Sequence, residues 1–152
     1  MRLILLCGLP GSGKTTLAKR LAVDLPAVRL SPDEWLTTLE VDLFDEPFRA
    51  RLETAFRRHA RDLLALGLTV VLESGFWTRA EREQLLREGR ALGAAVELRY
   101  LHAPLDELAR RLEARASGPG EVVISRTTLE GYATLFEQPD AAELALFDPP
   151  AV

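Results

Sequence analysis

The chain has 152 residues, of which 47% are hydrophobic and 28% are charged, and its formal net charge is −4. This composition is typical of one globular domain, and no apolar run is long enough to span a bilayer. The acidic balance argues against broad, sequence-independent binding to nucleic acid, and a single cysteine excludes an intrachain disulfide. We therefore expect one cytoplasmic domain over residues 1–152.

The first predicted strand, residues 3–7, leads directly into a glycine-rich segment and then into a helix. Residues 8–15 fill every position of the P-loop (Walker A) pattern, whose glycines let backbone N–H groups turn towards an anion at the helix start. Lys14 adds a charge that reaches the outer phosphates of a nucleotide, and the Thr15 hydroxyl is placed to ligate a bridging Mg²⁺. The predicted nucleotide-binding residues are Gly8, Leu9, Pro10, Gly11, Ser12, Gly13, Lys14, Thr15 and Thr16.

An acidic residue follows the second predicted strand, residues 27–30. Ser31 and Glu34 make a capping box there, with Pro32 at the first helical position, so the pattern predicts a helix start. Asp33 then lies in the first helical turn beyond a strand's carboxyl end, where open α/β sheets bind ligands. It is either a catalytic base or a carboxylate that stabilises the helix dipole.

A long predicted helix ends at Gly67, and the apolar strand of residues 68–73 follows it. Five arginines line the polar faces of the helix, and one or two of them could meet an anionic acceptor. These arginines are Arg49, Arg51, Arg57, Arg58 and Arg61. The strand is typical of one covered on both faces, and it ends on Glu73. Glu73 either holds a Mg²⁺-bound water, orients the acceptor, or is a plain polar strand end.

Strand and helix continue to alternate in the second half of the chain. A helix capped by Thr78 ends at Gly93, residues 94–101 form a fourth strand, and two later helices are capped by Thr127 and by Asp140. Such alternation predicts an α/β sandwich with a parallel sheet of at least four strands and right-handed crossovers.

The helix that starts at Pro104 carries two arginines four residues apart, Arg111 and Arg115, which share one face. A Gly-Pro-Gly break at residues 118–120 follows it. This combination suits a lid over about residues 110–126 that closes on ATP and excludes water. Solvated surface arginines are the alternative interpretation.

With the P-loop, the Asp33 turn, the strand ending in Glu73 and the arginine-bearing helix, the chain resembles the small P-loop kinases. It is similar to the kinase domain of phage polynucleotide kinase, the zeta toxins and chloramphenicol phosphotransferase, which are AAA-type ATP-binding kinases. The resemblance implies sheet order 2-3-1-4, ATP in the P-loop, Asp33 as base, and Arg111 and Arg115 as lid arginines on the phosphates. Polynucleotide kinases carry an arginine three residues after the base, where this chain has Leu36.

Taken together, these features predict an ATP- and Mg²⁺-dependent kinase that phosphorylates a hydroxyl of a small molecule. The expected catalytic residues are Lys14, Asp33, Arg111 and Arg115, and the expected metal ligands are Thr15 and Glu73. One alternative is a polynucleotide 5′-hydroxyl kinase, which Leu36 and the acidic charge disfavour. The other is an ATP-hydrolysing switch protein whose shape a partner reads.

Overall fold

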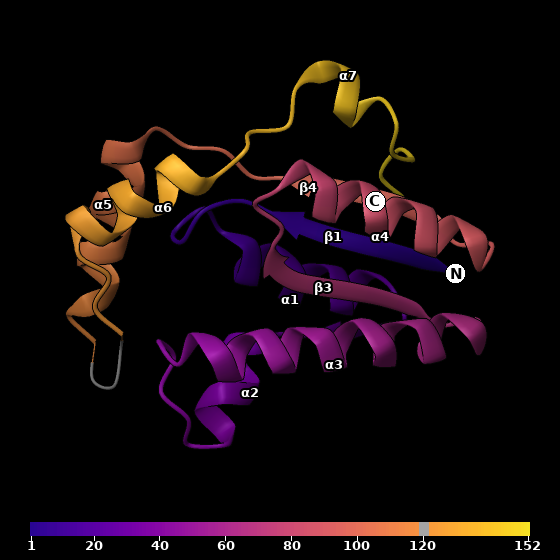
Figure 1. Cartoon of the computed structure of the whole chain (residues 1–152), viewed down its shortest axis with the longest axis horizontal. Coiled ribbons are helices and arrows are strands. Elements are labelled where there is room, and N and C mark those ends of the chain that lie inside the picture. Colours follow the sequence, from indigo (N-terminus) through magenta and orange to yellow (C-terminus); the bar gives the residue numbers. More distant parts are fainter. Residues whose placement is uncertain (119–121) are drawn as a thin grey trace.

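A computed structural model describes residues 1–118 and 122–152, which form a three-layer α/β sandwich (Figure 1). Its central sheet has four parallel strands in the order β2-β3-β1-β4. The strands are β1 (Arg2–Cys7), β2 (Ala27–Leu30), β3 (Thr69–Gly75) and β4 (Ala95–Tyr100). The fold class and the expected sheet order are confirmed, and the sheet has no fifth strand within the described residues.

Helices connect the strands and cover both faces of the sheet (Figure 1). In the described residues they are α1 (Lys14–Asp24), α2 (Pro32–Thr38), α3 (Glu46–Ala65), α4 (Arg79–Ala91), α5 (Leu105–Ala116), α6 (Arg126–Leu135) and α7 (Ala141–Leu144). None of these helices is both long enough and apolar enough to cross a membrane.

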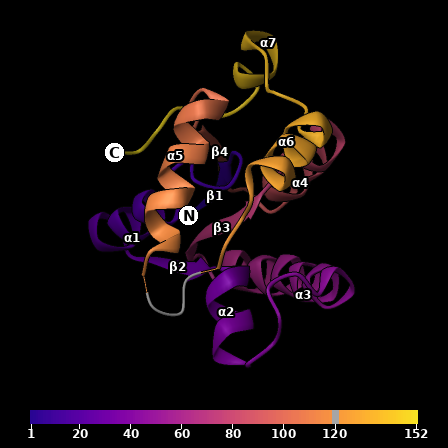
Figure 2. The ribbon, with the colours of Figure 1, turned by 90° about the vertical axis from the view of Figure 1, so that its left-hand side faces the viewer.

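The sheet is buried on both faces because successive side chains of a strand point to opposite sides. On β1, Leu3 and Leu5 belong to the core beneath α3 and α4, whereas Ile4 and Leu6 pack against α1. A third apolar cluster joins α5 and α6 to Leu9 of the loop after β1. Figures 1 and 2 show α2, α5 and α6 gathered at the end of the sheet where the strands terminate.

Helix starts follow the predicted caps at two positions and differ at a third. Thr78 and Asp140 each accept a hydrogen bond from the backbone N–H three residues on, as the pattern predicted. The prediction for α6 is wrong by two residues, since Ser125 and not Thr127 is the N-cap. Both residues offer a hydroxyl, but the Ser125 hydroxyl is the one that accepts from the Thr128 N–H, and Leu129 in the first turn is buried.

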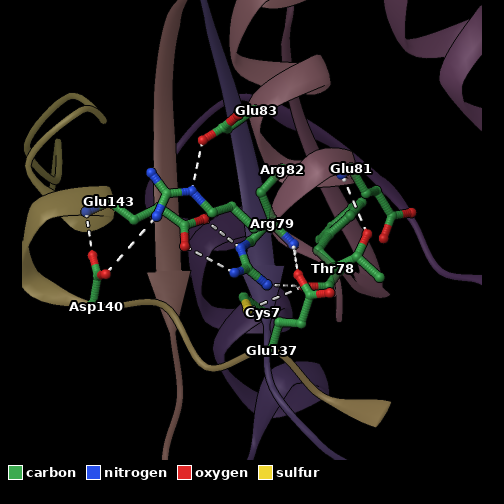
Figure 3. Close-up of polar contacts among 10 residues, drawn as sticks. Cys7, Thr78, Arg79, Glu81, Arg82, Glu83, Glu137, Asp140 and Glu143 are labelled. Carbon is green, nitrogen blue, oxygen red and sulfur yellow. Dashed lines mark hydrogen bonds and ion pairs between the residues drawn. The ribbon is translucent and has the colours of Figure 1, made fainter.

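A buried arginine–glutamate pair joins α7 to α4 (Figure 3). The side chains of Arg82 and Glu143 are 0% and 2% exposed, and the guanidinium donates to both carboxylate oxygens at 2.6 and 2.9 Å. Arg82 also donates to the carbonyl of Phe76 at 2.9 Å, and the Cys7 thiol donates to the same oxygen at 3.4 Å. Burial raises the pKa of Cys7 to about 12, so the thiol keeps its proton. We call these four residues the C-terminal latch.

The residues after α7 run along the outer edge of β4. The Asp148 N–H donates to the Val96 carbonyl at 2.8 Å, and the Asp148 carboxylate accepts from the Val96 N–H at 2.7 Å. The Ala151 N–H donates to the buried carboxylate of Glu97 at 3.1 Å. This segment therefore covers part of the edge of the sheet.

Candidate active site

The loop between β1 and α1 has the backbone of an anion cradle. Gly8 and Gly13 have φ angles of 153° and 97°, which side chains rarely allow. A Cβ at Gly8 would lie 2.7 Å from both the carbonyl oxygen of Leu101 and the Ser12 hydroxyl, so only glycine fits. The Gly8 N–H donates to the Gly75 carbonyl at 3.0 Å and fixes the loop against β3. The loop leads into the N-terminus of α1, where backbone N–H groups and the helix dipole favour an anion.

The Lys14 ammonium lies within this loop. It donates to the carbonyl oxygens of Gly8 and Leu9 at 3.0 and 2.8 Å, and it lies 3.5 Å from the Ser12 hydroxyl. Burial lowers the pKa of Lys14 to about 8, and among the surrounding charges Asp33 opposes this shift most. Asp33 is thus the acidic residue whose charge does most to favour the protonated form of Lys14.

Asp33 is held by an arginine from the next helix. Its side chain is 67% exposed, and Nη2 of Arg49 on α3 donates to its Oδ1 at 2.5 Å. The predicted capping box beside it is wrong, because Ser31 makes no side-chain capping bond. Glu34 instead accepts from Nη2 of Arg29 on β2 at 2.8 Å, a charge-assisted bond that is stronger than one to a neutral N–H.

Glu73 lies in β3 beside the P-loop, with its side chain 3% exposed. Burial raises the pKa of its carboxyl, while the Arg29 guanidinium, 2.6 Å away, and the nearby Thr15 hydroxyl lower it. Hydroxyl and carboxylate oxygens are ligands that Mg²⁺ prefers, so Thr15 and Glu73 fit this ion. No group of three or more His, Cys, Asp or Glu side chains in the described chain could hold a metal ion. Water and phosphate oxygens would have to supply the other ligands.

Both predicted lid arginines lie on α5 near the P-loop. Nη1 of Arg111 donates to the Gly11 carbonyl at 3.3 Å, while its Nε pairs with Glu107. The charge of Arg115 is one of those that act on the Lys14 ammonium. Residues 119–121 of the predicted lid, with part of its Gly-Pro-Gly break, lie outside the described residues.

Arg29 is a site residue that the sequence analysis did not single out. It lies opposite Val71 in the pairing of β2 with β3, and Glu73 lies two residues further along β3. Residues two apart on a strand share a face, so the opposite charges of Arg29 and Glu73 on neighbouring strands are a usable signal. Using that signal requires knowing how β2 and β3 are aligned, which the sequence alone did not supply.

Comparison with known proteins gives a family and a fold. The family model described as an AAA domain matches residues 3–139. No curated protein matches the sequence. Solved structures with a similar fold include one from the Pnkp1/Rnl/Hen1 RNA repair complex, which is 22% identical with a TM-score of 0.75. That match covers 88% of this chain and 43% of the other, so this chain spans less than half of its length.

Two further solved structures align with this chain over most of its length and over most of their own. A gluconokinase from Sinorhizobium meliloti 1021 is 19% identical with a TM-score of 0.60, over 92% of this chain and 77% of that one. Chaetomium thermophilum Kti12 in complex with ADP-AlF3 is 20% identical with a TM-score of 0.70, over 92% and 82%. At these identities the likeness shows a shared fold.

Proposed function

Because the chain belongs to the family described as an AAA domain, we propose that it is a small P-loop kinase, which transfers the terminal phosphoryl group of ATP to a hydroxyl of a small molecule in a Mg²⁺-dependent reaction. The observation that carries this proposal is the position of Lys14 inside the P-loop together with that of Asp33 in the first turn of α2, after the carboxyl end of β2. One is a cation inside a phosphate cradle, and the other is a carboxylate in the turn after the neighbouring strand. Phosphoryl transfer needs mainly positioning and charge neutralisation, together with a group that takes the acceptor's proton.

Each site residue has a role in this proposal. Lys14 neutralises the outer phosphates, and Arg111 and Arg115 add positive charge from α5. Thr15 and Glu73 would hold Mg²⁺, which supplies charge that bridges the phosphates. Asp33 orients the acceptor hydroxyl and takes its proton, while Arg49 fixes the direction of the Asp33 carboxylate.

Two observations favour a small molecule over a polynucleotide as the acceptor. Leu36, at the position where the polynucleotide kinases carry an arginine, is 0% exposed and packs in the interior. The net charge of −4 also disfavours a polyanion. The likeness to the gluconokinase supports a small acceptor, and the likeness to the RNA repair complex supports the alternative, a polynucleotide 5′-hydroxyl kinase.

Replacing Asp33 tests the proposal most directly. We expect Asp33→Asn to lower transfer from labelled ATP to the acceptor by about 10²- to 10⁴-fold, because it removes the general base. ATP binding, followed by calorimetry, should persist, whereas Lys14→Ala should weaken both binding and transfer. Asp24→Asn, at the far end of α1, is the matched control and should change neither.

The acceptor panel comprises neutral sugars and cyclitols, gluconate, nucleosides and a 5′-hydroxyl oligonucleotide. Full activity of Asp33→Asn would exclude this residue as the base. Slow ATP hydrolysis that needs no acceptor and is stimulated by a protein partner would instead support the switch interpretation.

A further inference from the structure

A row of five charged side chains crosses from α2 over α3 to the start of α4. Arg49, Glu53 and Arg57 follow one another at intervals of four residues and therefore share one face of α3. Arg49 pairs with Asp33 of α2, and Arg57 pairs with Glu81 in the first turn of α4. Figures 1 and 2 both show α2 beside α3. We call these five residues the α3 row.

Glu53 differs from the other members of the α3 row in its hydrogen bonds. Its side chain is 22% exposed, yet within residues 1–118 and 122–152 its carboxylate accepts no hydrogen bond. The nearest cation is Arg49, whose Nη1 lies 3.9 Å from Oε1 of Glu53. No buried side-chain oxygen of the described residues lacks a hydrogen-bond partner, so the oxygens of Glu53 are open to solvent and can accept from a ligand that donates hydrogen bonds. Burial also raises the pKa of Glu53 to about 7, a shift that is common at functional sites.

The position of Glu53 relates it to the proposed base. The guanidinium of Arg49 faces both carboxylates, because Nη2 donates to Oδ1 of Asp33 at 2.5 Å and Nη1 lies 3.9 Å from Oε1 of Glu53. The Asp33 and Glu53 carboxylates therefore lie beside one and the same guanidinium group. A compact acceptor with one hydroxyl at Asp33 can therefore bring a second hydroxyl to Glu53.

The charges of the α3 row indicate which kind of acceptor it suits. The row has three carboxyl groups and two guanidiniums, and both arginines are already paired with carboxylates. An anionic ligand would find both guanidiniums of the row already paired, whereas a neutral hydroxyl compound would donate hydrogen bonds to the carboxylates. The row therefore favours a neutral acceptor over a sugar acid or a polynucleotide.

We propose that Glu53 is a specificity-determining residue and that the acceptor is a neutral polyhydroxylated molecule of about the size of a sugar, whose second hydroxyl donates to Glu53. This inference rests on the proposed function, because it assumes transfer to a hydroxyl placed at Asp33. In that transfer the acceptor oxygen bonds to the γ-phosphorus of ATP, the bond to the β–γ bridging oxygen breaks, and ADP leaves. The hydroxyl proton passes to Asp33, and Glu53 takes no part in the chemical step.

Steady-state kinetics test this inference, with the acceptor varied at saturating ATP and ATP varied at saturating acceptor. The probes are glucose, ribose, glycerol and myo-inositol as neutral polyols, gluconate as a carboxylate, and a 5′-hydroxyl oligonucleotide. We expect a neutral polyol to have the highest kcat/KM. Glu53→Met should raise the KM of that polyol at least about tenfold and leave the KM of ATP unchanged, because only the acceptor loses a hydrogen bond.

Two further comparisons separate a direct contact from a general structural effect. Glu53→Gln keeps an acceptor oxygen and should show a smaller rise in KM than Glu53→Met. A deoxy analogue that lacks the second hydroxyl should bind wild type weakly and lose nothing more in Glu53→Met. Asp62→Asn removes a carboxylate from the exposed side of the same helix and should change no acceptor KM.

The outcomes also separate this inference from the proposed function. Preference for gluconate or the oligonucleotide over all neutral polyols would overturn the inference but leave a hydroxyl kinase in place. An unchanged acceptor KM in Glu53→Met would likewise overturn only the inference. Failure of every probe to accept a phosphoryl group would overturn the inference together with the proposed function.

Discussion

Arginine and carboxylate meet in two parts of this molecule in different surroundings. In the C-terminal latch both partners are buried, and Arg82 donates to two carboxylate oxygens and to a carbonyl. In the α3 row the Asp33 side chain is two-thirds exposed and receives one short bond from Arg49. A buried pair with its donors satisfied keeps one geometry, whereas a pair with one exposed partner can exchange that contact for water or a ligand. The same residue types thus support the scaffold in one place and the proposed chemistry in the other.

Breaking the latch should have the largest effect on stability. We expect Glu143→Ala to lower the free energy of unfolding by about 3–5 kcal/mol, because it leaves the Arg82 guanidinium buried without its partner. Urea unfolding followed by circular dichroism measures the change. Glu130→Ala, which breaks an exposed pair with Arg126, is the control and should have little effect. Equal losses in both variants would contradict the distinction between the two regions.

The α3 row should reduce stability near neutral pH, in contrast to the latch. Burial raises the pKa of Glu53 from 4.5 to about 7, although Arg49 and Arg57 lower it; Glu81 and Glu46 add to the rise. Between these pH values the folded chain keeps a proton that the unfolded chain has lost, so stability falls as pH rises through this window. Glu53→Gln should flatten this slope and stabilise the protein above pH 7 by about 1–3 kcal/mol. Urea unfolding across pH 4–8 checks this, and a parallel slope in both proteins would refute it.

The exposed pair should matter little for stability but more for turnover. Arg49→Met should cost at most about 1 kcal/mol of unfolding free energy, because its partner Asp33 is largely solvated. Without Arg49 the Asp33 carboxylate is no longer held in one orientation. We therefore expect kcat to fall by about 10- to 100-fold with the KM of ATP unchanged. Arg58→Met, an exposed arginine of the same helix, is the control. A large loss of stability in Arg49→Met would show that the pair of Arg49 and Asp33 supports the scaffold, as the latch does.

The backbone arrangement of the site could be predicted from local sequence, because each of its signals lies within a few residues. The glycines of the P-loop have the backbone angles that their positions required, and residues 27–30 form the predicted strand. Parallel sheet geometry then places the turn of Asp33 and the P-loop at one edge. The catalytic roles of Lys14 and Asp33 stay predictions.

The side-chain pairings could not be predicted in the same way. With 19 basic and 23 acidic residues, composition allows very many ion pairs, and tertiary packing selects among them. Arg82 and Glu143 are 61 residues apart, and Arg29 and Glu73 are 44 apart, so no local pattern connects them. Even a local pattern can fail, as Glu34 shows. Its carboxylate accepts a hydrogen bond from Arg29, and the predicted capping box does not form.

The segment that runs along β4 has a consequence for solubility. The open edge of a sheet can template strand addition by another polypeptide, which is a common route to aggregation. Here an incoming strand would have to displace the hydrogen bonds between Asp148 and Val96. It would also have to accommodate the charge of Glu97, which is paired with Arg2 and Arg99. The chain thereby protects an open β-sheet from intermolecular growth at this edge.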